Sequence, residues 1–453
     1  MKYRLLHRAF KLDEVSGGNN KREFERVASE LLAEGGAHAA VCANIDRFKI
    51  INDVYGEDEG NRILRTVQSI INDELSKDEV SGRIMADNFG MVVRYISIPM
   101  LDFRLKKIND ELAKLTNEKG ESYGLTMYYG VYIFGQEDDN INIAMERAHF
   151  ALASPLPSFM VPMGIYNKEE SQMFNREKEL EMKMRDALQR GEFVPYLQPK
   201  YELQGETVEG AEALVRWISP EGMIYPGEFI PLFEKNGFVV QLDHYMFEEV
   251  CKMQEKWFKE GYDLVPVSVN LSRCHLEIND FFSEYRSILS RYELPPRCIE
   301  IELTESLFFD NMEALNDLVS EIHEAGMTCS IDDFGSGYSS LNMLKDVKVD
   351  ALKLDRVFFQ GENNERGRHI VRSVLHLAQD LDLRTISEGV EEREQVSYLK
   401  EMNCDLIQGY VFAKPMPVDE FEKCAYKNRA KKSAKIEHLV PIDEYDAPIA
   451  GQG

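Results

Sequence analysis

Short apolar runs alternate with longer amphipathic segments along residues 193–411. The runs have the length of strands, and the segments between them place apolar residues at the three- and four-residue spacing of a helix. The predicted strands are Phe193–Leu197, Val208–Val215, Leu264–Val269, Ile299–Leu303, Thr328–Ile331, Ala351–Leu354, Thr385–Ser387 and Leu406–Val411. The predicted helices cover residues 227–235, 242–260, 278–291, 310–325, 366–381 and 391–402. Eight strands with interleaved helices are typical of a (β/α)8, TIM-like barrel, which takes about 250 residues.

Residues 1–166 show a less regular mixture of helix and strand patterns. Lys21–Ala33 and Asn61–Ile71 are predicted as amphipathic helices, and Ala39–Ile45 as a buried strand. The further expected elements are a strand–turn–strand that begins at Gly82, a helix over 101–115, a β-rich stretch over Leu125–Phe134 and a short helix near 141–153. This mixture predicts an α+β domain ahead of the barrel.

These patterns divide the chain into four segments: an α+β domain over 1–166, a linking helix over 167–190, the barrel over 191–425 and a flexible tail over 426–453. The linking segment is charged and helix-prone, and Gly191 is placed to end the helix. Leu180, Met184 and Leu188 recur every four residues in it. That repeat indicates either packing against a neighbouring element, which is the more common case, or a dimer seam.

The charge of the chain limits the classes of partner. It has 53 Lys and Arg against 79 Asp and Glu, a formal net charge of −26. Residues 167–425 hold 28 basic and 50 acidic side chains, a net charge of −22. A nucleic-acid polymer is therefore not an expected partner, because non-specific binding needs a basic surface that displaces counterions. The acidic excess by itself is most simply a solvated surface.

The cysteines and the apolar runs bear on localisation. The seven cysteines are scattered without a C-x-x-C pair, which is typical of neither a disulfide framework nor a thiolate zinc site. No run approaches the ~18 apolar residues of a membrane span, and no secretory signal peptide is recognisable. We therefore expect a cytoplasmic protein without a membrane span.

Polar residues stand where the predicted barrel strands end. They are Gln198 (in Gln198-Pro-Lys200), Glu212, Arg216, Asn270, Glu302, Glu305, Asp332, Asp333, Lys353, Glu388 and Gln408. The carboxyl ends of barrel strands form active sites, and carboxylates crowded there would repel one another without cations. Oxygen ligands without Cys or His favour Mg²⁺ or Mn²⁺. Two adjacent aspartates suit a site for two ions, which is typical of phosphoryl displacement.

The same strand ends carry a family resemblance over about residues 190–425. The motifs are Glu212–Leu214, Asn270–Ser272, Glu302–Glu305, Asp332–Leu341, Lys353–Arg356, Ser387–Glu391 and Gln408–Tyr410. In this order they resemble the motifs of EAL-domain cyclic di-GMP phosphodiesterases. The resemblance implies a barrel with one reversed strand, cyclic di-GMP as the substrate, linear pGpG as the product and a homodimer formed through this domain.

The resemblance also implies roles for single residues. Glu212, Asn270, Glu302 and Asp332 would hold one cation, and Asp332, Asp333 and Glu388 the other. The catalytic residues would be Lys353, Glu388 and Glu212, with Lys353 as a proton-transfer or water-orienting group. The substrate contacts would be Gln198, Arg216, Asp355 and Gln408. Glu305 would tether the glycine-rich loop after Asp333, which in the family couples dimerisation to metal binding.

Residues 13–166 resemble a GGDEF diguanylate cyclase domain through Asp13–Lys21 and Asn44–Gly56, but depart from its signature at Met85–Phe89. Met85 and Ala86 replace two glycines that let the backbone approach a nucleotide. The cyclase-site positions are Asn44, Asn52, Asn61, Asp87 and Asn88. Asn44 and Asn88 replace acidic residues, so negative charge for Mg²⁺ is lost, and Asn61 replaces an aspartate that contacts guanine. We expect no cyclase activity, and either a regulatory domain that binds GTP weakly or a folded interaction and dimerisation module.

Three functions remain open for the barrel. The first is a metal-dependent phosphodiesterase that linearises cyclic di-GMP. The second is a cyclic di-GMP receptor that does not hydrolyse its ligand, although such receptors usually lack one of the metal residues and this chain lacks none. The third is a phosphohydrolase for another substrate on the same scaffold.

Overall fold

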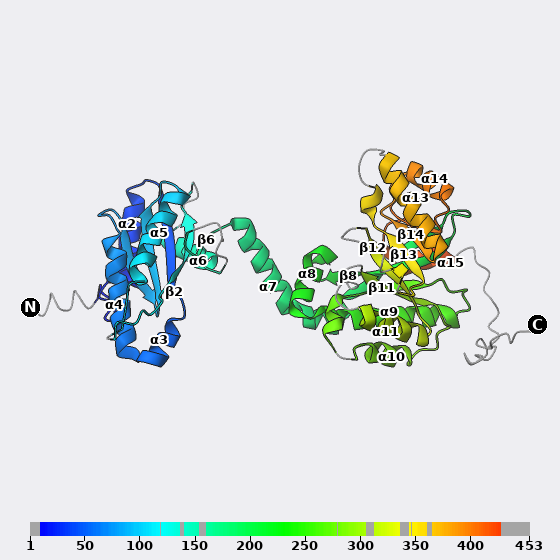
Figure 1. The fold of residues 1–453 in the computed structure, drawn as a ribbon, viewed down its shortest axis with the longest axis horizontal. Helices are drawn as coiled ribbons and strands as arrows, with labels where there is room; N and C mark the ends of the chain where they lie inside the picture. The colour runs from blue at the N-terminus through cyan, green and yellow to red at the C-terminus, as the bar shows by residue number, and fades with distance from the viewer. Residues whose placement is uncertain are drawn as a thin grey trace, which may run out of the picture. The chain divides into compact units, whose positions relative to one another are not determined.

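The computed structural model describes residues 10–117, 119–135, 140–153, 160–278, 280–304, 312–335, 344–345, 347–359 and 365–426. The chain divides into two compact units, Met1–Arg176 and Glu177–Gly453 (Figure 1). Each unit has its own hydrophobic core. Glu305, the glycine-rich loop from residue 336 and the predicted tail from residue 427 lie outside the described residues. The roles expected of these positions therefore stay predictions.

The first unit is built on a six-stranded sheet with the order β1-β3-β4-β2-β5-β6. Its elements are β1 Asn19–Asn20, α2 Lys21–Ala33, β2 His38–Ile45, α3 Phe48–Tyr55, α4 Glu57–Asp73, β3 Val80–Met85, β4 Asn88–Arg94, α5 Ile98–Leu112, β5 Met127–Ile133, α6 Ile141–Ala151 and β6 Met163–Ile165. The predicted α+β domain is confirmed, with α2 at its predicted bounds. Helix α3 was not predicted, because it has only eight residues and buries only Phe48 and Ile51.

The second unit is the predicted barrel. Its strands are β7 Phe193–Glu202, β8 Val208–Ser219, β10 Val267–Leu271, β11 Ile299–Thr304, β12 Thr328–Phe334, β13 Ala351–Leu354, β14 Arg384–Glu388 and β15 Leu406–Gln408. The ring closes because β7 pairs with both β8 and β15, antiparallel to each. The pairs from β8 through β10 to β15 are all parallel. The strand that runs opposite is therefore β7.

Helices cover the outside of the barrel. They are α8 Pro226–Asn236, α9 Val239–Lys259, α10 Phe282–Leu289, α11 Met312–Glu324, α13 Glu365–Asp380, α14 Arg393–Glu401 and α15 Val418–Tyr426. The 3₁₀ helices are η1 Arg273–Glu277 and η3 Arg356–Phe359, and two short strands, β9 Gly222–Ile224 and β16 Met416–Pro417, extend the sheet. The helix predicted over 278–291 is shorter than expected, because η1 precedes it and α10 begins only at Phe282. None of the described helices is long and apolar enough to cross a membrane.

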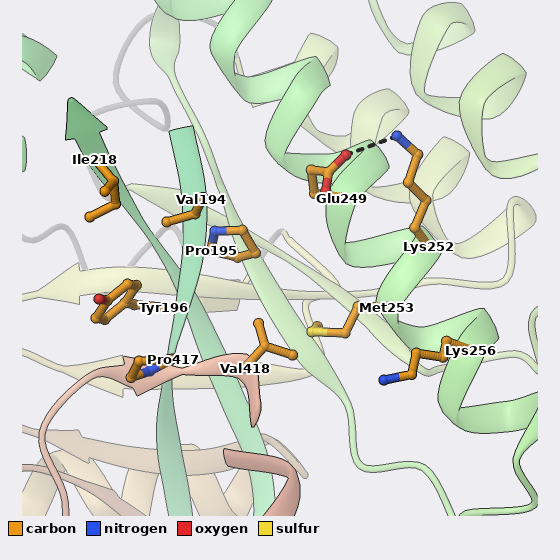
Figure 2. Close-up of a pocket in the computed structure, with 10 residues that line it drawn as sticks. All are labelled: Val194, Pro195, Tyr196, Ile218, Glu249, Lys252, Met253, Lys256, Pro417 and Val418. Atoms are coloured by element: carbon orange, nitrogen blue, oxygen red, sulfur yellow. Dashed lines mark hydrogen bonds and ion pairs between the residues drawn. The ribbon is translucent and has the colours of Figure 1, made fainter. Parts of the chain in front are cut away.

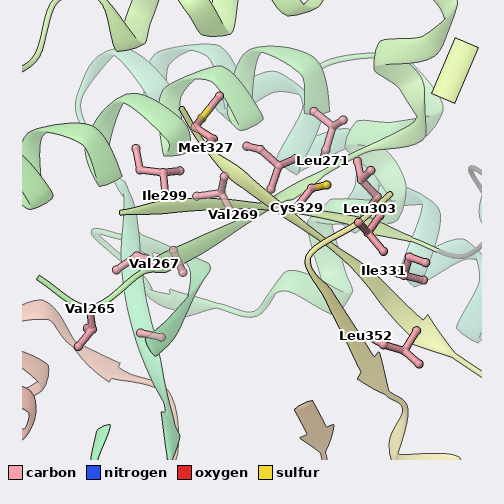
Figure 3. Packing of buried hydrophobic residues seen from close by; sticks show 14 of the residues in the cluster. Val265, Val267, Val269, Leu271, Ile299, Leu303, Met327, Cys329, Ile331 and Leu352 are labelled. Carbon is pink, nitrogen blue, oxygen red and sulfur yellow. The ribbon is translucent and has the colours of Figure 1, made fainter. Parts of the chain in front are cut away.

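The alternation of side chains along the strands separates the core from the site. Val267, Val269 and Leu271 of β10 belong to the hydrophobic cluster that also contains residues of the covering helices (Figure 3). The residues between them, Ser268 and Asn270, lie on the opposite face of the same strand, because side chains of a strand alternate with a period of two. Strand β10 thus presents polar side chains on the face opposite to the hydrophobic cluster.

Helix α7, Lys168–Gln189, contains the boundary between the two units. Gly191 ends it as predicted: its backbone has φ +70°, and the Gly191 and Glu192 N–H groups donate to Leu188 and Ala187 carbonyls. Leu180 and Met184 are buried in a cluster with Trp217 and several phenylalanines of the second unit. The described contacts of the four-residue repeat are therefore those of packing within the chain.

Candidate active site

Six neighbouring strands of the barrel bring polar side chains to one end. These are Glu212 on β8, Asn270 on β10, Glu302 on β11, Asp332 on β12, Lys353 on β13 and Glu388 on β14. Pairing between strands aligns them: Asn270 lies opposite Glu302, and Thr304, two residues beyond Glu302, lies opposite Asp332. We call the carboxylates of this set, together with that of Asp333, the acidic rim. Its members are Glu212, Glu302, Asp332, Asp333 and Glu388.

Lys353 lies at the centre of the acidic rim and is fully buried. Its Nζ atom is 2.6 Å from Glu388 Oε1, 2.7 Å from Glu302 Oε2 and 3.0 Å from Asp332 Oδ1. Glu212 Oε2 is farther away, at 3.7 Å. Burial alone would lower the pKa of this lysine, but the surrounding carboxylates outweigh it and raise the pKa well above its ordinary value. The surrounding carboxylates therefore favour the charged ammonium form of Lys353 within the rim.

Glu212 is held by amides rather than by Lys353. Asn270 Nδ2 donates to Glu212 Oε1 at 2.9 Å, and Gln408 Nε2 donates to Glu212 Oε2. Gln408 Nε2 also donates to Gln198 Oε1 at 3.2 Å. Gln198 lies directly opposite Glu212 because the reversed strand β7 pairs with β8. The structure thus brings two of the predicted site residues, Asn270 and Gln408, onto one carboxylate, and Gln198 joins them through Gln408.

Asp332 and Asp333 lie near the end of β12, where its pairing with β13 shifts register. Asp333 has φ +55°, a left-handed conformation that is uncommon for a residue with a Cβ atom, and its N–H donates to Asp332 Oδ1 at 2.9 Å. Carboxylate oxygens of Asp332, Asp333 and Glu388 lie within 4.8 Å of one another. Burial, and then the charges of Asp332 and Asp355, raise the pKa of Asp333 to about 6. The geometry brings together the three residues predicted to share one cation.

The protonation of the rim is uneven. Burial and neighbouring carboxylates raise the pKa values of Glu212 and Glu388. At Glu302, burial acts in the same direction, but Lys200 and Lys353 outweigh it and lower the pKa to about 2. A divalent cation bound to Glu212 and Glu388 would favour their charged forms and so lower these raised pKa values.

Two buried oxygens test whether the rim suits a cation. Glu302 Oε2 and Glu388 Oε1 are buried and, among the described residues, have no hydrogen-bond partner of ordinary geometry, although Lys353 Nζ is near both. A buried oxygen without such a partner is costly unless a cation or water is bound to it. The donors are carboxylates and one amide, the ligands that Mg²⁺ and Mn²⁺ prefer. The residues present therefore fit hard divalent cations.

Comparison with known families matches this site to a sequence family. The model of the EAL domain family matches residues 181–415, slightly more than half of the chain. The chain belongs to the EAL domain family. A second model, that of the GGDEF diguanylate cyclase domain, matches residues 10–155, so the two domains stand in tandem. The resemblance seen in the sequence is confirmed in both parts.

Several curated relatives match most of this chain. NbdA of Pseudomonas aeruginosa, named a cyclic di-GMP phosphodiesterase, is 28% identical over 424 residues, which are 92% of this chain and 54% of NbdA. PdeR of Escherichia coli, named likewise, is 30% identical over 427 residues, 93% of this chain and 64% of PdeR. The chain thus spans between half and two thirds of the length of these relatives. A solved structure titled PaMucR phosphodiesterase in a c-di-GMP complex has 33% identity and a TM-score of 0.51, and the match covers 54% of this chain and 99% of that one.

Two predicted substrate contacts of the EAL domain lie beside the rim. Arg216 is partly buried on β8, donates to the carbonyl of Val215 and has its guanidinium carbon 5.5 Å from the centre of the Tyr196 ring. Asp355 follows β13 and accepts from the Val357 N–H at 2.7 Å, which places its carboxylate at the start of η3. The charge of Asp355 contributes to the raised pKa of Asp333, so the two carboxylates are neighbours.

The GGDEF domain has an amide pair at two of the predicted cyclase-site positions. Asn44 Nδ2 donates to Asn88 Oδ1 at 3.1 Å across paired strands β2 and β4. Asn52 lies on α3 with its side chain against Gly60, Asn61 follows on α4, and Asp87 stands in the turn between β3 and β4. The described residues of this domain contain no group of three metal-ligating side chains. The side chains of Asn44 and Asn88 therefore bond each other.

In the sequence, the motif Gln198-Pro-Lys200 predicts that Lys200 stands at a strand end and so at the rim, although no role is predicted for it. This predicted position is wrong. Strand β7 runs opposite to its neighbours and continues to Glu202, so Lys200 lies opposite Gly210, below the level of Gln198 and Glu212. Its Nζ atom is 3.0 Å from Glu302 Oε1. The inward direction of the Lys200 side chain could have been predicted from the sequence. Two residues apart in a strand, Lys200 and Gln198 lie on the same face.

A cavity of about 580 Å³ lies apart from the acidic rim. It is bordered by β7, β8, α9 and the segment around Pro417, as Figure 2 shows. Its lining is mainly apolar and contains none of the rim carboxylates. The charged groups there include the Glu249–Lys252 pair, 2.8 Å apart, whose charges compensate one another. We assign this cavity no part in the chemistry of the rim.

Proposed function

We propose that the EAL domain of this chain is a cyclic di-GMP phosphodiesterase that opens the ring to linear pGpG with two divalent cations, Mg²⁺ or Mn²⁺. The observation that carries the proposal is the convergence of Glu212, Glu302, Asp332 and Glu388 around Lys353 at one end of the barrel. The names of the relatives NbdA and PdeR support the substrate class. The identity of 33% to the MucR phosphodiesterase structure supports it further.

The ligands divide into two groups. Glu212, Asn270, Glu302 and Asp332 would hold one cation, and Asp332, Asp333 and Glu388 the other. When bound, two divalent cations supply positive charge to an anionic phosphodiester and make water more acidic. This requirement also explains how an acidic domain accepts an anionic substrate.

The other residues of the site position the reacting groups. The Lys353 ammonium forms ion pairs with Glu302, Asp332 and Glu388 and so gathers three ligands around one positive charge. While it carries its proton, it cannot accept one from the attacking water, so it acts as a donor and a charge. Arg216 would contact a phosphate of the substrate, because its planar fork of donors suits phosphate oxygens.

Gln198, Asp355 and Gln408 would complete the substrate contacts. Gln408 Oε1 is buried and, within the described part of the chain, has no hydrogen-bond partner. It is therefore available to accept from a ligand N–H group such as those of guanine. Gln198 lies beside Gln408, to which it is hydrogen-bonded. Asp355 lies beside Asp333.

The test is a product assay on the purified chain. We expect linear pGpG from cyclic di-GMP with Mg²⁺ or Mn²⁺, no product in EDTA, and none from the Glu212→Gln variant. The matched control is Glu221→Gln, which removes an exposed glutamate paired with Lys183 and should keep full activity. Binding of cyclic di-GMP without turnover under all these conditions would instead make the domain a receptor, and faster turnover of another phosphodiester in a panel would reassign the substrate.

A further inference from the structure

A second lysine is buried in the barrel interior. Lys200 has a side-chain exposure of 2%, and its Nζ atom is 2.9 Å from Ser268 Oγ, 3.0 Å from Glu302 Oε1 and 3.4 Å from Glu300 Oε1. It reaches these groups from β7, which runs opposite to the other barrel strands. The ammonium therefore lies beneath the acidic rim.

The two lysines divide the oxygens of Glu302 between them. Lys200 Nζ is 3.0 Å from Oε1, whereas Lys353 Nζ is 2.7 Å from Oε2. The Oε1 atom accepts a hydrogen bond from Lys200, but Oε2 has no hydrogen bond of ordinary geometry among the described residues. One oxygen is thus fixed toward the interior and the other is directed toward the rim.

We propose that Lys200 is a positioning residue for the metal site: it binds Oε1 of Glu302 and so leaves Oε2 as the single oxygen that this glutamate offers to a cation. The inference rests on the proposed function, because it assumes that Glu302 is a metal ligand. Side chains that hold a metal ligand in place typically contribute 10–100-fold to metal affinity.

A purely structural role would look different. Lys200 also neutralises Glu300, which lies two residues before Glu302 on the same face of β11. However, Glu300 Oε1 already accepts a hydrogen bond of 2.6 Å from Ser330 Oγ, and its distance to Lys200 is the longer one. If Lys200 served only to balance Glu300, removing the charge of Glu300 would make the lysine dispensable.

The experiment measures Mn²⁺ binding by calorimetry on metal-stripped full-length protein, with thermal unfolding in EDTA as the measure of folding. Lys200→Met keeps the length of the side chain and removes its charge, and should weaken Mn²⁺ binding by 10-fold or more. Glu300→Gln is the matched control and should change Mn²⁺ affinity by less than about 2-fold. The double variant Lys200→Met/Glu300→Gln should remain weak, and in a Glu302→Gln background Lys200→Met should have no further effect.

Several outcomes would overturn the proposal. Wild-type affinity in folded Lys200→Met would do so, and so would recovery of affinity in the double variant. If Lys200→Met does not fold, the double variant decides, because it buries one charge fewer. Failure of the proposed function is distinguishable, since wild-type protein would then form no pGpG from cyclic di-GMP, whereas the Mn²⁺ affinities of the variants would still test the role of Lys200.

Discussion

Lys353 and Glu388 form the shortest ion pair of the acidic rim, with Nζ and Oε1 2.6 Å apart and the lysine fully buried. The same ammonium serves Glu302 and Asp332. Removing one partner of a buried ion pair is costly because the charges that remain have no counter-charge. Lys353 therefore links the stability of the barrel to the occupancy of the site by cations.

The first prediction concerns Lys353→Met. We expect its free energy of unfolding in EDTA to fall by about 3–5 kcal/mol, and excess Mn²⁺ to recover part of this loss, because cations would then compensate the carboxylates. Turnover of cyclic di-GMP should be lost. Urea unfolding with and without Mn²⁺ measures the effect. Lys183→Met, which removes an exposed pair with Glu179, should cost less than about 1 kcal/mol, and an equal loss with and without Mn²⁺ would contradict the prediction.

The second prediction concerns the pH dependence of stability. Burial, and to a lesser degree His275, lower the pKa of His244 to about 4. In the unfolded chain His244 has an ordinary pKa of about 6.5, so the unfolded chain binds the proton at a higher pH than the folded chain does. The neutral ring therefore makes its full contribution to the free energy of unfolding above pH 6.5, and this contribution is lost as the pH falls toward 4. Because the ring is only partly buried, we expect roughly 1–2 kcal/mol rather than the full value of the shift.

The measurement compares His244→Phe with wild type. His244 Nε2 is buried and, within the described residues, has no hydrogen-bond partner, so the substitution should cost little at pH 7. Its ring packs edge-on against Tyr285, and phenylalanine can keep this contact. Chemical unfolding between pH 4 and 7 should give a flatter profile for the variant. The exposed His369→Phe variant should keep the wild-type slope, and an unchanged slope in His244→Phe would show that another group is responsible.

Much of the fold could be predicted from the sequence because hydrophobic periodicity is a local property. All eight barrel strands were placed, and β13 Ala351–Leu354 had its observed bounds. The direction of β7 could not be worked out from periodicity, since an apolar strand reads alike in either orientation; only the family resemblance implied a reversed strand. The short helix α3 was missed because its two buried residues leave almost no periodic signal.

The residues of the candidate site could be predicted from the sequence, but most of the contacts between them could not. The rim carboxylates and Lys353 were identified because charged residues at the ends of apolar strands are conspicuous in the sequence. The bonds between them were not predictable, because they depend on register: Gln198 meets Glu212 and Lys200 meets Glu302 only through the antiparallel pairing of β7. The pairing of Asn44 with Asn88 likewise required the alignment of β2 with β4.

The third prediction concerns the GGDEF domain. We expect the chain to form no cyclic di-GMP from GTP and Mg²⁺, because Asn44 and Asn88 bond each other at 3.1 Å and supply no charge for a metal. Replacing both by aspartate puts two carboxylates in contact, which should lower the unfolding free energy of this domain by about 1–2 kcal/mol, with partial recovery in Mg²⁺. Chromatographic product analysis and thermal unfolding measure the two effects. Detectable product from wild-type protein would contradict the assignment.

A GTP titration that changes neither the melting temperature nor the hydrolysis rate would remove the regulatory role and leave an interaction module.

The last prediction concerns Asp350, at the end of the barrel opposite the rim. Its carboxylate accepts from Arg297 at 2.9 Å, from the Cys329 N–H at 2.9 Å and from His323 at 2.8 Å, if the tautomer places the proton there. Cys329, His323 and Asp350 resemble a set of metal ligands, but the bonds already made by the carboxylate indicate a structural anchor between β12 and β13.

If Asp350 is such an anchor, Asp350→Ala should cost about 2–3 kcal/mol of unfolding free energy, chiefly because the Cys329 N–H at the start of a buried strand loses its acceptor. Arg297→Ala should cost less than about 1 kcal/mol, since the arginine is largely exposed. Mn²⁺ affinity and turnover at the rim should be unchanged in both variants. A rise of several degrees in the melting temperature of wild-type protein with Zn²⁺, absent in Asp350→Ala, would instead identify a metal site, because a ligand that binds only the folded state raises its stability.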